Sequence, residues 1–305
     1  MQWKEIEITD RELLQRAFEN INSQASEMSF ANMYMWRYNY NTRINVIENM
    51  LCMVSDSRRF IPFAFCPVPL GVFQPEEFRK AVMALKVYFN DQGWKLMFGR
   101  VEEKNLALFK RCPDFRATFK KIDANSDYVY NTESLIALAG KKLSSKRNHI
   151  NKFLREYGSF EYVEINKDNI TECKRIFDEW CEKNDDCECE VKEECEKWAC
   201  SELLDNWDRI PGLKGALIGV NGRFQAFTIG EMLNSDTAVI HIEKGNTDIN
   251  GIYPLINREF IAGTFSHTRF VNREEDMGKA GLKQAKSSYH PAAKIHKYNI
   301  YPEFK

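Results

Sequence analysis

Apolar and polar residues alternate along the first part of the chain with two different periods. Short runs with every second residue apolar indicate strands, and apolar residues at spacings of three and four indicate helices with one buried face. Asp10 is a favourable N-cap for the first such helix, and Pro75 is typical of a first helical turn. In chain order, the pattern predicts a strand at 3–9, helices at 10–22 and 30–37, strands at 41–47, 50–55 and 60–66, a helix at 75–90, a strand at 95–101, a helix at 102–110 and a strand at 115–122.

The same order of elements recurs in the second part of the chain. The dipeptide Asn221-Gly222 separates two alternating runs and favours a type I′ hairpin turn between them. After an extended run at 127–131 and a helix that ends near Tyr157, the pattern predicts a strand at 160–165, helices at 169–183 and 190–207, strands at 214–220, 223–232 and 237–244, a helix at 251–263, a strand at 269–271, a helix at 279–287 and a strand at 293–301. We therefore expect an N-terminal domain at 1–126 and a C-terminal domain at 127–305 that carries the main site.

The composition limits the classes of partner and the location. The 305 residues include 43 basic and 44 acidic side chains, so the formal net charge of −1 gives no general attraction to nucleic acids or anionic membranes. The most apolar stretch, 60–73, is interrupted by Pro62, Pro67 and Pro69, and no apolar run follows a basic start. We expect a soluble, cytoplasmic protein without a signal peptide or a transmembrane helix.

The nine cysteines show neither the spacing of a zinc ribbon nor a redox CxxC pair, so reduced thiols are the simplest interpretation. Cys187, Cys189 and Cys195 lie in an acidic stretch and offer ligands for a soft metal. However, no histidine is near, and structural zinc sites use two well-spaced ligand pairs. We therefore expect no metal site.

The segment 270–298 is unusually rich in charged and turn-forming residues. Carboxylates and Arg273 follow a short strand-like run, two glycines indicate a turn, and three lysines then follow at near-helical spacing. Pro291 ends this helix, because a proline disfavours helical angles in the residue before it. Two interpretations remain open, namely a pocket for an anionic or strongly polar ligand and a salt-bridged helix on the surface.

The repeated element order is that of the GCN5-related N-acetyltransferase fold, so we expect an α+β protein with two such domains in tandem, each a mixed sheet flanked by helices. The phrases IGEML, IHIEKGN, NREEDMGKAGLKQAKSSYHP and KKLSSKRNHINKF resemble the family of the lysyl-phosphatidylglycerol synthase C-terminal domain. The likeness covers nearly all of the chain and is strongest from Lys141 onward. In that family, and in the related Fem-type aminoacyltransferases, characterised members take an aminoacyl group from a charged tRNA. The resemblance thus implies aminoacyl-tRNA as donor substrate and no required cofactor.

The sequence is a poor match to a coenzyme A site. Coenzyme A transferases of this fold hold the pyrophosphate on a Q/R-x-x-G-x-G/A loop at the start of the helix after the fourth strand. The corresponding residues are DINGIY at 248–253, in which Asp248 replaces the opener and bulky Tyr253 replaces a small residue. Gly251, the one glycine that remains, is either a cofactor-binding position for acyl-CoA, the alternative donor, or an ordinary glycine at a helix start.

Residues 141–155 form a basic helix with six lysines or arginines, one histidine and no acid. Helical spacing places Leu143, Ile150, Phe153 and Leu154 on a buried stripe. The outer face would suit the phosphates of tRNA, an anionic lipid headgroup or a nucleotide, although a solvated helix is the alternative. The candidate residues for binding nucleic acid or phosphate are Lys142, Lys146, Arg147, His149, Lys152 and Arg155.

A possible reacting centre lies on the strand 237–244. Alternation places His241 and Glu243 on one face, and a pairing of Ile229 with His241 would add Glu231 to it, although a one-residue slip would remove it. As candidate catalytic residues, these side chains could accept a proton from an attacking amine or hydroxyl. The alternative is a structural pair of His241 and Glu243. Direct attack on an aminoacyl ester needs no covalent enzyme intermediate, and no nucleophile motif is present.

The resemblance also implies a set of substrate-binding residues in the second domain. Lys286 and Lys297 would bind phosphate or carboxylate and Asp276 an amino group, whereas the alternative is internal bracing. The implied set is Arg273, Asp276, Lys286, Tyr289, His290 and Lys297. The sequence therefore predicts an acyltransferase that moves an aminoacyl group from tRNA to a small-molecule or lipid-like acceptor. An acetyl-CoA-dependent N-acetyltransferase and a catalytically silent module that binds an anionic ligand or RNA are the alternatives.

Overall fold

The computed structural model describes residues 2–57, 59–183 and 195–305 and divides the chain into two compact units. Unit 1 comprises Met1–Asp127, Glu275–Gly278 and Ile295–Lys305, and unit 2 comprises Tyr128–Glu274 and Lys279–Lys294. The predicted domain boundary at 126 is one residue before Asp127, where the first segment of unit 1 ends. The predicted C-terminal domain differs from unit 2, however, because the chain returns to unit 1 twice after that point.

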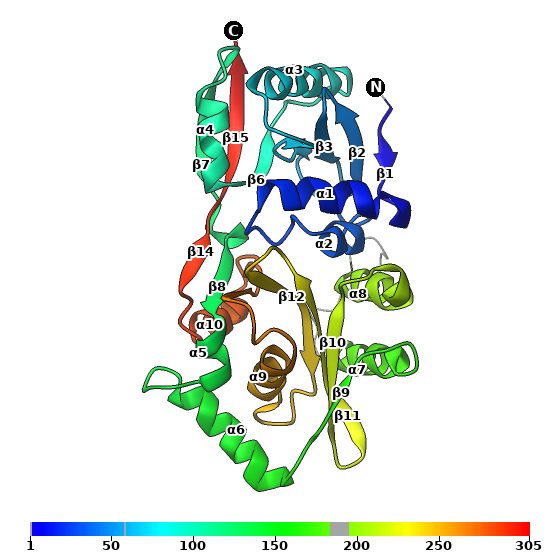
Figure 1. Cartoon of the computed structure of the whole chain (residues 1–305), viewed down its shortest axis with the longest axis vertical. Helices are drawn as coiled ribbons and strands as arrows, with labels where there is room; N and C mark the ends of the chain where they lie inside the picture. Colours follow the sequence, from blue (N-terminus) through cyan, green and yellow to red (C-terminus); the bar gives the residue numbers. More distant parts are fainter. Residues whose placement is uncertain (1, 58, 184–194) are drawn as a thin grey trace. The chain divides into compact units, whose positions relative to one another are not determined.

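Unit 1 is built on a mixed sheet of eight strands in the order β1-β2-β3-β4-β6-β15-β7, with β5 paired to β3 outside this path (Figure 1). The strands are β1 (Lys4–Glu5), β2 (Thr42–Ile47), β3 (Met50–Ser55), β4 (Phe63–Ala64), β5 (Val68–Pro69), β6 (Phe98–Glu102), β7 (Phe115–Lys121) and β15 (Lys297–Phe304). The helices are α1 (Arg11–Ile21), α2 (Phe30–Met35), α3 (Pro75–Asp91) and α4 (Leu106–Lys110). Its core forms where α3 packs Phe78, Leu85 and Phe89 against the sheet.

Unit 2 is built on a mixed sheet of seven strands in the order β14-β8-β13-β12-β11-β10-β9. The strands are β8 (Asp127–Asn131), β9 (Glu161–Glu164), β10 (Lys214–Val220), β11 (Arg223–Met232), β12 (Thr237–Gly245), β13 (Phe270–Asn272) and β14 (Ala293–Ile295). The helices are α5 (Thr132–Ala137), α6 (Ser144–Tyr157), α7 (Ile170–Glu182), α8 (Glu196–Asp205), α9 (Ile252–Thr264) and α10 (Ala280–Ser287). Figure 1 shows α7 and α8 on one face of this sheet and α9 on the other.

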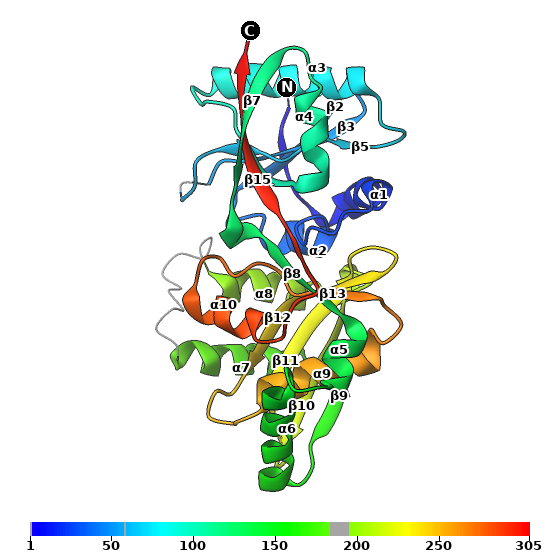
Figure 2. The same cartoon turned by 90° about the vertical axis from the view of Figure 1, so that its left-hand side faces the viewer.

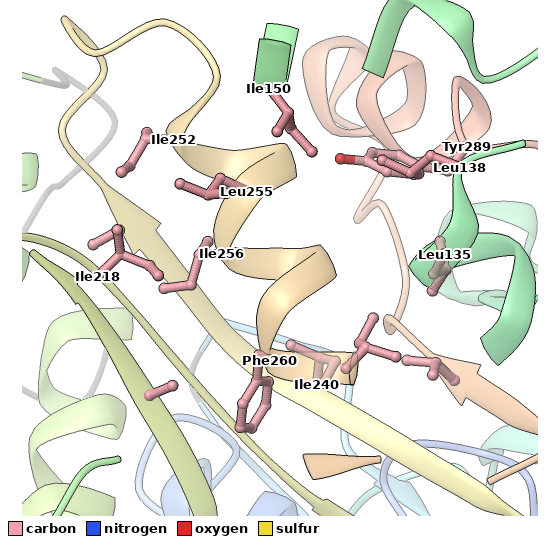
Figure 3. Close-up of a cluster of buried hydrophobic side chains, with 14 of the residues drawn as sticks. Leu135, Leu138, Ile150, Ile218, Ile240, Ile252, Leu255, Ile256, Phe260 and Tyr289 are labelled. Atoms are coloured by element: carbon pink, nitrogen blue, oxygen red, sulfur yellow. The ribbon is translucent and has the colours of Figure 1, made fainter. Parts of the chain in front are cut away.

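The main core of unit 2 lies between α9 and the sheet face that it covers. Leu255, Ile256 and Phe260 of α9 are buried against Ile218 and Ile240 of the sheet, and Figure 3 shows these side chains pointing toward one another. Residues from α5 and α6 close the same cluster, because they turn their apolar stripes toward α9. In α6 the stripe predicted from the sequence is buried at Leu143, Ile150 and Phe153, with Leu154 packed against it.

The two sheets share one arrangement. Each contains a parallel pair, β4/β6 in unit 1 and β12/β13 in unit 2, beside a run of antiparallel strands. In each sheet the second strand of this pair is flanked by a strand that is distant in sequence. β15 pairs with both β6 and β7, as Figure 2 shows for β15 (red) and β7 (green), and β8 pairs with β13. This architecture confirms the predicted α+β class with two mixed sheets flanked by helices.

Some predicted elements differ from the structure. The single strand predicted at 293–301 is two strands, β14 in the sheet of unit 2 and β15 in that of unit 1. The strand predicted at 60–66 is reduced to β4, and α5 was not predicted at all. Of the helix predicted at 190–207, the part before residue 195 lies outside the described residues, as do Cys187 and Cys189 of the weighed metal site.

The described cysteines are not all reduced thiols. Five are free and buried, whereas Cys181 and Cys195 are disulfide-bonded, so the interpretation of nine reduced thiols is wrong. Within the described ranges, the structure contains no group of three His, Cys, Asp or Glu side chains placed to hold a metal. No helix in those ranges is long and apolar enough to cross a bilayer.

Candidate active site of unit 2

The parallel strands β12 and β13 part soon after they meet. Their pairing runs from Thr237 opposite Phe270 to Val239 opposite Asn272, whereas β12 itself continues to Gly245. The side chains that follow these pairs on both segments therefore share the space between diverging backbones. Ligand sites commonly form at the carboxyl ends of parallel strands, where neighbouring segments separate.

A β-bulge at His241 changes the predicted register of β12. Ile229 lies opposite Ile242 and Gly230 lies opposite Ile240, so His241 is the extra residue on its strand. The predicted pairing of Ile229 with His241 is therefore wrong. His241 nevertheless contacts Glu231, because the bulge leaves its side chain within reach of that carboxylate.

His241 is fully buried between two carboxylates. Its Nε2 lies 3.0 Å from Glu231 Oε1 and its Nδ1 lies 2.9 Å from Glu274 Oε1. Burial lowers the pKa of His241, but the hydrogen bonds to Glu231 and Glu274 outweigh it and raise the pKa to about 9. At neutral pH both ring nitrogens therefore carry protons, and each N–H donates a hydrogen bond to a carboxylate. Such an imidazolium cannot accept a proton, so the geometry favours bracing over the predicted role as a base.

The raised pKa of His241 predicts a specific dependence of stability on pH. A group whose folded pKa lies above its unfolded value of about 6.5 stabilises the fold fully below that value and loses the contribution as pH rises toward 9. The difference in unfolding free energy between wild type and His241→Gln should therefore shrink by about 3 kcal/mol between pH 6.5 and 9. Urea denaturation across this range measures it. His290→Gln is the control, because it removes an exposed imidazole that lies outside the pair of carboxylates around His241.

Glu243 is paired with Arg273 rather than with His241. Glu243 Oε1 accepts a hydrogen bond from Arg273 Nη2 at 3.0 Å, and Oε2 accepts one from Asn257 Nδ2 of α9 at 3.1 Å. The two charged side chains are only 12–13% exposed. Arg273 Nη1 and Asn257 Oδ1 are buried and have no hydrogen-bond partner within the described part of the chain. The cluster thus holds an oriented ion pair together with an unused donor and an unused acceptor, which is unusual for buried polar groups.

Lys146 of α6 belongs to the same cluster. Its Nζ lies 4.3 Å from the ring centroid of Tyr289, and the Arg273 guanidinium lies 4.8 Å from that centroid. Burial and the nearby charge of Arg273 lower the pKa of Lys146. Tyr130 also lies near Arg273, and its hydroxyl donates a hydrogen bond to the backbone carbonyl of Lys286 at 2.7 Å. A half-buried lysine with a lowered pKa loses its proton more readily than an exposed one, and its neutral amine can accept a proton.

Two predicted ligand residues lie in unit 1 and not in this cluster. Lys297 is fully buried, and its Nζ lies 2.6 Å from Asp127 Oδ1 and 2.6 Å from Glu27 Oε2. Asp276 is buried, and its Oδ1 accepts the backbone N–H of Gly278 within its own turn at 2.8 Å. These contacts correspond to internal bracing, the alternative for this set.

Two further predicted ligand residues flank Tyr289. Lys286 is half-buried on α10, and its described contact with the cluster is the backbone carbonyl that accepts from Tyr130. His290 is exposed and has a positive φ of 53°, so it directs the chain after α10 rather than lining the cluster. Of the six implied residues, the described contacts bring the side chains of Arg273 and Tyr289 together beside Glu243.

Some basic residues of α6 contact other parts of unit 2, and the others are open to solvent. Lys146 turns to Tyr289, and Arg147 donates to the carbonyls of Leu138 and Gly140 at the end of α5. The rest of the face is open. His149, Lys152 and Arg155 line a shallow hollow of about 680 Å³, and Lys142 is exposed near the start of the helix.

Gly251 is explained by its contact with α6. It has a φ of 90°, and a Cβ at this position would overlap the carbonyl oxygen of His149. His149 also bonds the adjacent loop, with Nδ1 2.7 Å from Asn250 Oδ1. The backbone of α6 thus lies directly against the start of α9. Glycine is required here for close packing and a left-handed backbone, as expected of an ordinary glycine at a helix start.

Sequence reasoning missed three members of the site. Asn257 is a single buried amide among the apolar residues of α9, and this isolated polar residue on a buried stripe was the available signal. Glu274 was part of the charged segment but received no role. Tyr130 lies on an apolar strand and gave no signal, because a tyrosine hydroxyl has a definite partner only in three dimensions.

Comparison with known proteins places the chain in a family. A family model described as "Phosphatidylglycerol lysyltransferase, C-terminal" matches residues 18–301. The crystal structure of a conserved protein of unknown function from Bacteroides thetaiotaomicron VPI-5482 matches with a TM-score of 0.88 and 31% identity, over 99% of this chain and 100% of that chain. The C-terminal domain of a putative lysylphosphatidylglycerol synthetase from Agrobacterium fabrum has the same fold, with a TM-score of 0.66 and 16% identity over 95% and 91% of the two chains.

A curated relative matches over a shorter stretch. An uncharacterized protein of Mycoplasmoides gallisepticum (strain R(low / passage 15 / clone 2)) is 24% identical over 179 residues, which are 58% of this chain and 56% of that protein. The match thus spans little more than half of the relative's length. The family model, in contrast, extends over both units, and it confirms the resemblance inferred from the sequence phrases. The chain therefore belongs to the family of phosphatidylglycerol lysyltransferase C-terminal domains.

Proposed function

We propose that the chain is an acyltransferase that moves an aminoacyl group from a charged tRNA to a small-molecule or lipid-like acceptor. Family membership supports acyl transfer, since the family is described by the transfer of a lysyl group to phosphatidylglycerol. The observation that favours this donor over acyl-CoA is the close contact between Gly251 and the backbone of α6, because Gly251 corresponds to the middle glycine of the loop that holds the pyrophosphate in coenzyme A transferases.

The start of α9 leaves little room for coenzyme A. The pyrophosphate of that cofactor needs free backbone N–H groups and open space at this helix terminus. Here α6 packs against Gly251, and Asp248 adds a carboxylate that binds Lys183 Nζ at 2.5 Å. Tyr253 occupies the last position of the loop, where coenzyme A transferases have a small residue. Its hydroxyl accepts a hydrogen bond from the N–H of Gly245 and donates one to the carbonyl of Gly245. These contacts disfavour the alternative of an acetyl-CoA-dependent enzyme.

The cluster around Glu243 supplies the groups that aminoacyl transfer needs. The Glu243 carboxylate would bind the ammonium group of the aminoacyl moiety, and Arg273 Nη1 would donate to its ester carbonyl as negative charge develops there. The acceptor N–H or O–H attacks the carbonyl carbon and forms the new bond, while the bond from that carbon to the ribose oxygen breaks. Lys146 would take the proton from the acceptor and pass it to the leaving oxygen. No covalent enzyme intermediate is involved.

The open part of α6 would bind the phosphates of the tRNA. Double charge reversal, Lys152→Glu with Arg155→Glu, should weaken tRNA binding and reduce the slope of log K against log salt by about 2, because two phosphate contacts are lost. Filter binding at several salt concentrations measures both effects. Lys167→Glu changes an exposed lysine of the same unit outside the hollow and should leave the slope unchanged. An unaltered slope in the double variant would remove α6 from the tRNA site.

The reaction itself is tested with the full chain, labelled aminoacyl-tRNA and two kinds of acceptor, namely phosphatidylglycerol vesicles and soluble amines. Transfer of the label to an acceptor is the expected result. Turnover of acetyl-CoA without transfer from tRNA would instead support the N-acetyltransferase. Retention of RNA without transfer to any acceptor would support a silent binding module and contradict the proposal.

A further inference from the structure

Unit 1 contains a cavity of about 430 Å³ beside its own parallel strand pair. β4 and β6 meet at a single pair, Ala64 with Phe98, after which the chain leaves β6 and continues to β5, which pairs with the opposite end of β3. The cavity lies where these segments separate. Its walls include Val68 of β5, Glu102 at the end of β6 and Ile21 at the end of α1.

The cavity wall combines apolar side chains with polar and charged ones, and Glu102 is the one carboxylate among its described residues. The apolar side chains of the wall include Ile21, Ala25, Met28, Val68, Phe73 and Leu108. The Glu102 side chain is 9% exposed. Its Oε2 accepts a hydrogen bond from Ser23 Oγ at 2.8 Å and lies 3.4 Å from Lys104 Nζ. Its other oxygen, Oε1, has no hydrogen-bond donor among the residues that the structure describes.

The cations that line the cavity already have acceptors. Lys104 Nζ donates to the carbonyls of Ile21 and Asn22 at the end of α1, in addition to its contact with Glu102. The Arg100 guanidinium donates to Glu27, to Glu275 and to the hydroxyl of Tyr40. An anionic ligand would have to displace these carboxylates and carbonyls. A hydrogen-bond donor, in contrast, meets a nearly buried carboxylate oxygen that is still available.

We propose that this cavity binds a primary ammonium ligand with a short apolar body, whose N–H groups donate to Glu102 Oε1. Charge-assisted hydrogen bonds of this kind are stronger than neutral ones, and the apolar side chains of the wall would cover the carbon chain of the ligand. The site belongs to unit 1 and does not depend on the transfer reaction proposed for unit 2. It gives the first unit a ligand of its own.

The test compares three probes of equal chain length on the full, wild-type chain, namely n-hexylammonium, hexan-1-ol and hexanoate. Backbone amide NMR reports the site directly through the signals of Ser23, Glu102 and Lys104. The ammonium probe should shift these signals and bind at least about tenfold more tightly than the alcohol, and hexanoate should not bind. Equal affinities for the ammonium and the alcohol would overturn the proposal, because the carboxylate would then play no part.

Two isosteric substitutions locate the contact. Glu102→Gln keeps an acceptor for Ser23 and should weaken hexylammonium binding about tenfold or more, with hexanol binding unchanged. Glu103→Gln removes the neighbouring exposed carboxylate and should have no effect. Undiminished hexylammonium affinity in Glu102→Gln would overturn the assignment. If that variant does not fold, the comparison of the three probes on the wild-type chain decides alone.

Discussion

Replacement of Lys297 by methionine is expected to lower the free energy of unfolding by about 3–5 kcal/mol, because it leaves buried carboxylates without their cation. Lys297 is fully buried, and its ammonium group lies between Asp127 and Glu27 at 2.6 Å from each. Its removal also withdraws positive charge from Glu275, which lies 3.9 Å away. Urea denaturation followed by circular dichroism measures the loss.

Two control variants distinguish the effect of removing a buried charge on stability from the effect of replacing any lysine by methionine. Lys120→Met alters an exposed lysine on β7, the strand next to β15, and should change stability by less than about 0.5 kcal/mol. Lys297→Met combined with Asp127→Asn removes charges of both signs and should recover part of the loss. A Lys297→Met protein as stable as wild type would show that the ion cluster contributes nothing to the fold.

The same cluster joins segments that are far apart in the sequence. Asp127, Glu275 and Lys297 lie at or next to the ends of the three segments that make up unit 1. Burial and the neighbouring Glu27 and Glu275 raise the pKa of Asp127 to about 7, while Lys297 opposes the rise. Three carboxylates share two cations here, Lys297 and Arg100, so the most buried carboxyl retains a proton most readily. The cluster therefore fixes the chain where it enters and leaves the unit.

The sequence predicted well those elements that depend on local pattern. β10 and β11 have the bounds expected from alternation, 214–220 and 223–232. The turn between them has φ of 53° at Asn221 and 76° at Gly222, as a type I′ turn requires. Strand pairing is not a local property. The sequence therefore could not show that residues from Lys297 onward pair with β6 and β7, which lie nearly two hundred positions earlier in the chain.

Two expectations for the site differ from the structure, because they depended on contacts that the local pattern does not determine. A bulge shifts the register at His241, and no residue type marks its position in the sequence. The resemblance implied a ligand-binding role for Lys297, but its charge is held by Asp127 and Glu27, which are distant in the chain. The pairing of Arg273 with Glu243 agrees with internal bracing, the alternative interpretation of the implied set of ligand residues.

Arg273→Gln is expected to reduce aminoacyl transfer by about a hundredfold to a thousandfold, as is typical when one donor to a developing oxyanion is removed. Arg273 holds Glu243 with Nη2 and leaves the buried Nη1 without a partner among the described residues, so its substitution removes both the orientation of Glu243 and the proposed carbonyl donor. Single-turnover transfer from labelled aminoacyl-tRNA measures the rate. Arg258→Gln breaks an ion pair on the more exposed side of α9 and should leave that rate unchanged.

The loss of rate must be distinguished from a loss of structure, because Arg273→Gln leaves the nearly buried Glu243 carboxylate without its cation. The double variant Glu243→Gln with Arg273→Gln removes both charges and should recover the melting temperature while remaining inactive. Recovery of both stability and transfer in the double variant would show that the pair only braces β12 against the segment after β13. A folded but inactive double variant, together with unchanged tRNA binding, would place the requirement for Arg273 and Glu243 in the transfer step, since α6 would still hold the donor.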